Sequence, residues 1–88
     1  MVNEGREVDI TVRVVAIRDG TQGISISMPD RVVGEWTDSG ARSLTITDEH
    51  GISIRGTDGV QRYLLTMPGT PVRGEQHSDT EATIAMRI

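Results

Sequence analysis

Residues 13–32 and 42–60 follow one shared pattern, which is the pattern of a β-hairpin. Each copy begins at an Arg, reaches an Asp six residues later, turns, and continues as Gly-Ile-Ser-Ile. Side chains that alternate with a period of two on both sides of a reversal predict paired antiparallel strands. Two origins of the repeat are open. It reflects either an internal duplication that relates two similar halves by an approximate two-fold axis, or chance similarity, because β-hairpins use a limited set of residues.

The apolar residues also favour strands. Nine Ile and nine Val stand against three Leu, and β-branched side chains suit a pleated sheet better than a helix. Six segments are predicted as strands: residues 7–18, 24–28, 43–47, 52–55, 60–67 and 81–88. The two stretches without a clear period, 30–41 and 68–80, are predicted as loops, the first with room for one short helical turn. We therefore expect one all-β domain over residues 1–88, with about six antiparallel strands in a small barrel or sandwich.

The residues that usually carry chemistry are sparse. The chain has no Cys, which excludes disulfide scaffolds, Cys-ligated zinc and thiol nucleophiles. It has neither a nucleophile elbow nor a Gly-rich phosphate loop. His50 and His77 fall in separate predicted loops, whereas a metal needs three or four converging ligands. We expect no enzymatic activity, no cofactor and no metal, and an enzyme would require His50, His77 and two acidic side chains to converge.

The charge pattern limits the classes of partner. The net charge is −4, all nine basic residues are Arg, and these are scattered rather than clustered. Nucleic-acid binding needs clustered basic charge, and no apolar run reaches the roughly 18 residues that span a bilayer. We expect neither nucleic acid nor membrane as a partner, and a cytoplasmic location. The absence of Lys has two open explanations, GC-rich codon usage or selection against Lys.

Two aromatic residues stand out in a chain that is otherwise aliphatic. Trp36 lies between Glu35 and Asp38 in the predicted link between the hairpins, where it either caps the open end of a barrel or anchors a protein partner. Tyr63 belongs to a second apolar surface with Val15, Ile17, Leu65 and Met67. Closure of the sandwich or another subunit must cover such a surface. The predicted strands also carry little Pro or Lys to protect their edges, so we expect a homodimer or a higher homo-oligomer.

These observations predict a small, acidic, non-enzymatic protein-binding module. We expect an accessory or inhibitor protein of the kind that phages and mobile elements encode, acting by occupying the surface of a partner. The residues expected to contact the partner are Glu35, Trp36, Asp38, Tyr63, Arg73, Glu75 and His77. Two alternatives are open: a self-assembling tail, capsid or shell subunit whose sheet edges pair between copies, and a small barrel that binds a sugar or nucleotide near Trp36.

Overall fold

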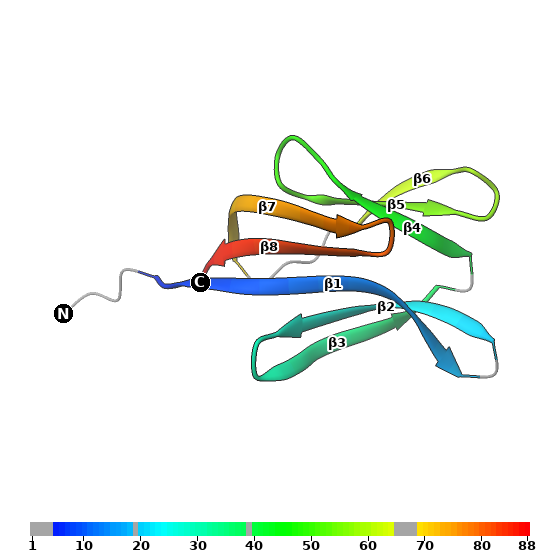
Figure 1. Ribbon diagram of the computed structural model, residues 1–88, viewed down its shortest axis with the longest axis horizontal. Coiled ribbons are helices and arrows are strands. Elements are labelled where there is room, and N and C mark those ends of the chain that lie inside the picture. Colours follow the sequence, from blue (N-terminus) through cyan, green and yellow to red (C-terminus); the bar gives the residue numbers. More distant parts are fainter. Residues whose placement is uncertain (1–4, 19, 39, 65–68) are drawn as a thin grey trace.

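The computed structural model describes residues 5–18, 20–38, 40–64 and 69–88, with the backbone alone described for residues 17, 18, 63 and 64. Within this part of the chain every regular element is a strand (Figure 1). The strands are β1 (Glu7–Arg18), β2 (Thr21–Met28), β3 (Arg31–Thr37), β4 (Ala41–Ile46), β5 (Ile52–Gly56), β6 (Gln61–Leu64), β7 (Thr70–Ser78) and β8 (Glu81–Arg87). The predicted all-β class is confirmed, and no helix in the described residues is long and apolar enough to span a membrane.

The strands form two antiparallel sheets. The larger sheet has five strands in the order β3-β2-β1-β8-β7, and the smaller has three in the order β4-β5-β6. Among the described residues the strands do not close into a barrel, so of the two predicted architectures the sandwich is the one that fits. In Figure 1 the smaller sheet lies toward the β7 side of the larger one, and β3 forms the opposite border.

The structure adds two strands to the six predicted, because both stretches assigned to loops contain a strand, and those two loop assignments are wrong. Residues 31–37 form β3 beside β2, and residues 70–78 form β7 beside β8. Both added strands are bordering strands with shifts in register, one in β3 and two in β7. A bulge inserts an unpaired residue and breaks the alternation of side chains. The alternation of side chains between the two faces of the sheet could therefore not be recognised in the sequence of these segments.

The repeated sequence does mark two hairpins, β1–β2 and β4–β5, but their registers differ. Leu44 lies opposite Ile54 and is buried. Its counterpart in the repeat, Val15, lies opposite Gly23, and the neighbouring Val14 packs against the core instead. The first strands of the two copies thus turn opposite sets of side chains inward. The repeat identifies two hairpins, not two superimposable halves.

Aliphatic side chains from both sheets form one core. The larger sheet contributes Ile10, Val12, Ile24, Ile26, Ala82, Ile84 and Met86, and the smaller contributes Ala41, Leu44, Ile52 and Ile54. Strand β4 packs against β1, β2, β7 and β8. Full burial of one such Ile or Leu side chain stabilises the fold by about 1.5–3 kcal/mol. The core therefore lies under the three middle strands of the larger sheet, β2, β1 and β8, and neither bordering strand, β3 or β7, contributes a residue to it.

Candidate functional site

The outer edge of β4 is closed by the β7–β8 hairpin. The amide of Leu44 donates to the carbonyl oxygen of Asp79 at 2.8 Å. The side chain of Gln76 pairs with two further groups: Oε1 accepts from the amide of Ile46 at 3.0 Å, and Nε2 donates to the carbonyl oxygen of Leu44 at 3.0 Å. One side-chain amide thus takes the place of a neighbouring strand. This edge has no room for another strand.

The β7 border of the larger sheet is obstructed in a different way. Pro71 has no N–H to offer, and the strand changes register on both sides of its centre. Its backbone also presses against the smaller sheet, since a Cβ placed on Gly74 would lie 2.9 Å from the side chain of Ile46. Arg73 forms an ion pair with Glu7 at 2.6 Å. Proline, bulges and charges are the features by which natural sheets prevent their edges from pairing.

The β3 border is less obstructed: it has one register shift, against two in β7, and it has no Pro. Its residues are exposed apart from Gly34, which is half-buried, and it contains no Pro and no Lys. Val32, Val33 and Trp36 are 57%, 44% and 41% exposed, and they are three of the five exposed large apolar side chains in the described residues. Trp36 lies opposite Ile24 and Val32 opposite Ser27, so the two side chains are on opposite faces of the sheet, and the exposed apolar residues follow the strand. We call residues 31–37 with their outward backbone groups the β3 edge.

The backbone of the β3 edge presents hydrogen-bonding groups away from β2. The amide of Asp38 donates to the carbonyl oxygen of Gln22 at 3.0 Å, and Trp36 lies opposite Ile24 two residues further along. In an antiparallel pair, hydrogen-bonded and non-hydrogen-bonded positions alternate. Trp36 therefore bonds toward β2, while the N–H and C=O groups of Glu35 and Thr37 point outward.

Trp36 lies on the side of the sheet that faces the core, because its cross-strand neighbour Ile24 is buried. The ring lies flat along its own strand: a Cβ on Gly34 would be 3.2 Å from the Cη2 atom of Trp36. With no barrel in the described residues, the alternative in which Trp36 caps a barrel mouth is wrong. The ring instead lies on the core-facing side of the sheet at its border and stays 41% exposed.

The acidic neighbours of Trp36 differ in their surroundings. Glu35 is exposed and lies opposite Ser25, on the other face of the sheet from Trp36. Asp38 is engaged within the chain, where Oδ2 accepts from Arg62 at 2.6 Å and Oδ1 accepts from the amide of Gly40 at 3.3 Å. Of the two carboxylates, Glu35 is the one placed to meet a partner.

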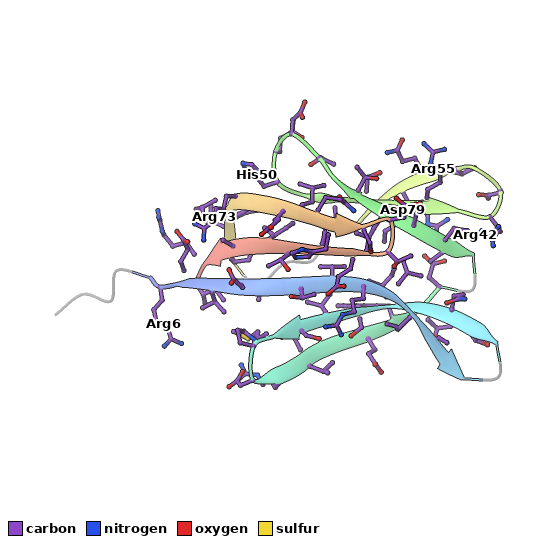
Figure 2. The ribbon with its side chains drawn as sticks, viewed as in Figure 1. Arg6, Arg42, His50, Arg55, Arg73 and Asp79 are labelled. Carbon is purple, nitrogen blue, oxygen red and sulfur yellow. The ribbon has the colours of Figure 1, made fainter. Side chains whose placement is uncertain are left out.

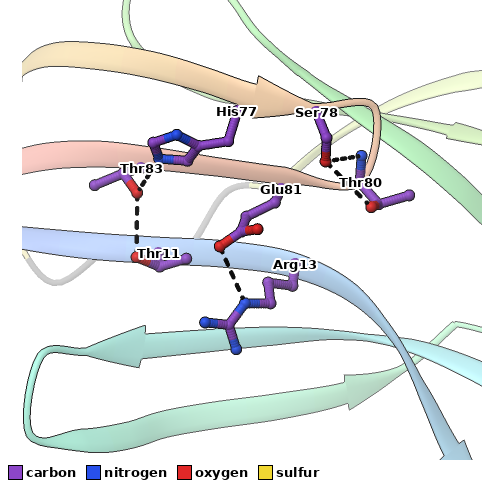
Figure 3. Close-up of polar contacts among 7 residues, drawn as sticks. All are labelled: Thr11, Arg13, His77, Ser78, Thr80, Glu81 and Thr83. Carbon is purple, nitrogen blue, oxygen red and sulfur yellow. Dashed lines mark hydrogen bonds and ion pairs between the residues drawn. The ribbon is translucent and has the colours of Figure 1, made fainter.

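The other predicted contact residues lie elsewhere. Arg73, Glu75 and His77 are on β7, at the opposite border of the larger sheet, and Figure 2 shows Arg73 there. His77 Nε2 contacts Thr83 Oγ1 at 2.8 Å, and Thr83 Oγ1 contacts Thr11 Oγ1 at 3.2 Å, so His77 joins a row of hydroxyls across three strands (Figure 3). Tyr63 is in β6, where its backbone lies opposite Ser53 of β5, and its side chain falls outside the described part. The structure therefore does not bring the predicted set together on one surface.

The second apolar surface expected around Tyr63 is described only at Val15, which is half-buried. Ile17 is described by its backbone alone, and Leu65 and Met67 lie outside the described residues. Reasoning from sequence missed Val32 and Val33, which fell in the stretch assigned to a loop. Two adjacent β-branched residues followed by Trp36 were the signal for a strand there.

The described residues contain little that resembles a reaction centre or a ligand pocket. No three His, Cys, Asp or Glu side chains gather in this part of the chain. His50 lies at the turn between β4 and β5, well apart in sequence and element from His77 on β7 (Figure 2). A hollow of about 530 Å³ lies along Arg6–Asp9 and Met28–Arg31 and is also lined by Arg73, and Trp36 is not among its lining residues.

Comparison of the chain with protein-family models, with curated proteins and with solved structures finds no match. The functional interpretation therefore depends on the geometry of the molecule itself.

Proposed function

We propose that this chain is a small, non-enzymatic protein-binding module that holds its partner at the β3 edge. One observation supports the proposal above all others. The β3 edge combines three exposed apolar side chains with outward backbone groups, while the edges of β4 and β7 are closed or obstructed. Addition of a strand to an open sheet edge is a common mode of protein recognition.

When a strand is added to the β3 edge, its backbone groups and its side chains have separate roles. The N–H and C=O groups of Glu35 and Thr37 bond to the backbone of an extended segment and fix its direction. Trp36 supplies the apolar contact area, and Trp is among the residues that contribute most to binding energy at interfaces. The exposed carboxylate of Glu35 lies at the rim, where a charge affects the rate of association more than the affinity.

The role of an accessory or inhibitor protein agrees with this mode of binding. The chain is short, it has a net charge of −4, and its described residues hold no cluster of catalytic type. Such a protein acts by occupying a surface that its partner needs for another contact. Nothing observed favours the sugar- or nucleotide-binding alternative, because that reading requires a barrel with a pocket at Trp36.

The test is a pull-down from the presumed host cells, followed by reconstitution with the purified partner and a binding measurement by calorimetry. Two variants address the β3 edge: Trp36→Ser removes the apolar contact, and Glu35→Pro removes an outward N–H while sparing the bonds to β2. Val60→Ser is the matched control, because Val60 is 54% exposed and lies before β6, far from β3 in sequence. We expect both β3 variants to weaken binding at least tenfold and the control to leave it unchanged. Equal binding by all three variants would reject the β3 edge as the contact surface.

A further inference from the structure

The partner of the β3 edge can be specified from the geometry of the strand. We infer that β3 pairs with β3 of a second copy of this chain, antiparallel, about a two-fold axis that passes beside Trp36. The inference depends on the proposed function, because it names the occupant of the same edge. It is carried by four observations: the direction of the backbone groups, the position of the charged residue, the position of Trp36 and the state of the other edges.

The backbone groups restrict the register. After the bulge in β3, Glu35 and Thr37 are the residues whose N–H and C=O point away from β2. In an antiparallel pair, outward residues bond only to outward residues of the other strand. Pairing along the straight segment that follows the bulge therefore places Glu35 opposite either Glu35 or Thr37 of the second copy.

The charge of Glu35 decides between these two registers. Glu35 opposite Glu35 would place two carboxylates directly across from each other, which destabilises a cross-strand pair. Glu35 opposite Thr37 avoids this contact. In this register the two-fold axis produces two Glu35–Thr37 pairs, and each pair forms two backbone hydrogen bonds. The outward N–H and C=O groups of both residues are therefore bonded in both copies.

In this register Trp36 of one copy lies opposite Trp36 of the other, on the two-fold axis. The position is a non-hydrogen-bonded one, where opposite Cα atoms approach to about 4.5 Å and side chains contact most closely. Aromatic pairs at such positions are among the favourable cross-strand contacts. Gly34 has no side chain, so the ring of Trp36 can lie along its own strand over Gly34.

Two of the three other sheet edges, those of β4 and β7, do not offer a second place for such pairing. The smaller sheet packs against β1, β2, β7 and β8, and β3 lies at the opposite border of the larger sheet in Figure 1. The β7 border is obstructed and the β4 edge is closed by Gln76 and Asp79. Pairing of β3 with β3 uses the same patch on both copies, so this interface is closed by its own two-fold symmetry and joins two copies only.

The first experiment measures mass by sedimentation velocity over a wide range of protein concentration. We expect a dimer for the wild type and for the Val60→Ser control, and a monomer or a dimer at least tenfold weaker for Glu35→Pro and Trp36→Ser. Circular dichroism and a thermal melt check that each variant is folded. A wild-type monomer at every concentration overturns the inference, as does a dimer that persists unchanged in both folded β3 variants.

The second experiment tests the register by disulfide formation, which is clean because the chain has no Cys of its own. Glu35→Cys and Thr37→Cys proteins are oxidised separately and as an equal mixture, with Val60→Cys as the control for random collision. Since Glu35 and Thr37 lie opposite each other, we expect the mixture to cross-link faster than either protein alone. Glu35→Cys that cross-links best with itself would overturn this register, and cross-linking no faster than Val60→Cys would overturn the β3 pairing.

These outcomes separate the inference from the proposed function. A monomeric wild type whose Glu35→Pro variant loses a purified foreign partner overturns the dimer and leaves the β3 edge as the binding surface. A Glu35→Pro protein that keeps both its mass and its foreign partner overturns both.

Discussion

The two bordering strands of the larger sheet, β3 and β7, both have backbone N–H and C=O groups that point away from the sheet. A further strand can approach these groups at β3 but not at β7. At β7, Pro71, two register shifts and the contact of Gly74 with Ile46 prevent another strand from approaching. At β3 the outward groups of Glu35 and Thr37 are accessible, and exposed apolar side chains lie beside them. The comparison teaches that whether a bordering strand can bind depends on a few side chains and on what packs against it, since both borders belong to one hydrogen-bonded sheet.

At β4, in the smaller sheet, a few groups likewise decide whether the edge is open. Its edge would be as open as that of β3 without the side chain of Gln76 and the carbonyl oxygen of Asp79. Both groups come from the β7–β8 hairpin. The hairpin that protects its own border thus protects the border of the second sheet as well.

The largest expected effect is at Trp36, on association and to a smaller extent on folding. We predict that Trp36→Ser weakens association at the β3 edge by about 2 kcal/mol, or about thirtyfold in Kd, as expected for a central Trp anchor. Trp36 is 41% exposed, so more than half of its surface is covered in the monomer, and the free energy of unfolding should fall as well, by roughly 1–2 kcal/mol. Sedimentation under conditions where the variant is folded and urea denaturation measure the two quantities. Unchanged association by a folded but less stable variant would mean that Trp36 serves the fold alone.

Removal of the group that closes β4 should have the next largest effect. Gln76→Ala leaves the amide of Ile46 and the carbonyl oxygen of Leu44 without their side-chain partner. We predict a loss of about 1–2 kcal/mol in the free energy of unfolding, the cost of leaving polar groups unpaired at a partly covered site. Urea denaturation checks this, with Glu75→Ala on the same strand as the control. The closing role of Gln76 would be rejected if both variants were equally stable.

A smaller effect is expected at Gly74, where β7 presses on the smaller sheet. A Cβ there would lie 2.9 Å from two carbon atoms of Ile46, so Gly74→Ala overpacks the contact between the two sheets. We predict a loss of about 1 kcal/mol, the lower end for overpacking, because the end of the Ile46 side chain can shift. Thermal melts of Gly74→Ala, Ile46→Val and the double variant measure the coupling. If the contact is as described, the double variant is more stable than the sum of the two single losses predicts.

The smallest effect concerns salt. Each copy carries a net charge of −4, so two copies repel each other weakly at long range. Added salt screens such repulsion, and the Debye length falls to about 3 Å at 1 M ionic strength. We predict that the β3 dimer becomes tighter, by roughly twofold to threefold, between low and high salt. A dimer that weakens with salt would point to an interface held by ion pairs, unlike the β3 pairing.

Prediction from sequence succeeded where one face of a strand is buried along its length. The first strand was predicted at residues 7–18, which are the bounds of β1, because Val8, Ile10, Val12 and Val14 alternate toward the core. It failed at β3 and β7, where bulges interrupt the alternation and most side chains are exposed. A bordering strand with little burial leaves little apolar pattern to read.

The candidate site was anticipated only in part. Trp36 was singled out because it is one of two aromatic residues in the chain, and it does lie exposed on an open edge. Asp38 was grouped with it from proximity in sequence, yet its carboxylate bonds to Arg62 across to the smaller sheet. Arg73, Glu75 and His77 were joined to it as a loop, and the order of the strands places them at the far border.

The sequence by itself determined the extended backbone, the antiparallel hairpins and the aliphatic core, because these depend on neighbours that alternate along a single segment. The tertiary structure alone decided which edge stays open. Gln76 closes β4 from 30 residues away, and Gly74 obstructs β7 through a contact with the other sheet. Such contacts join segments distant in the chain, and they arise only when the two sheets pack together.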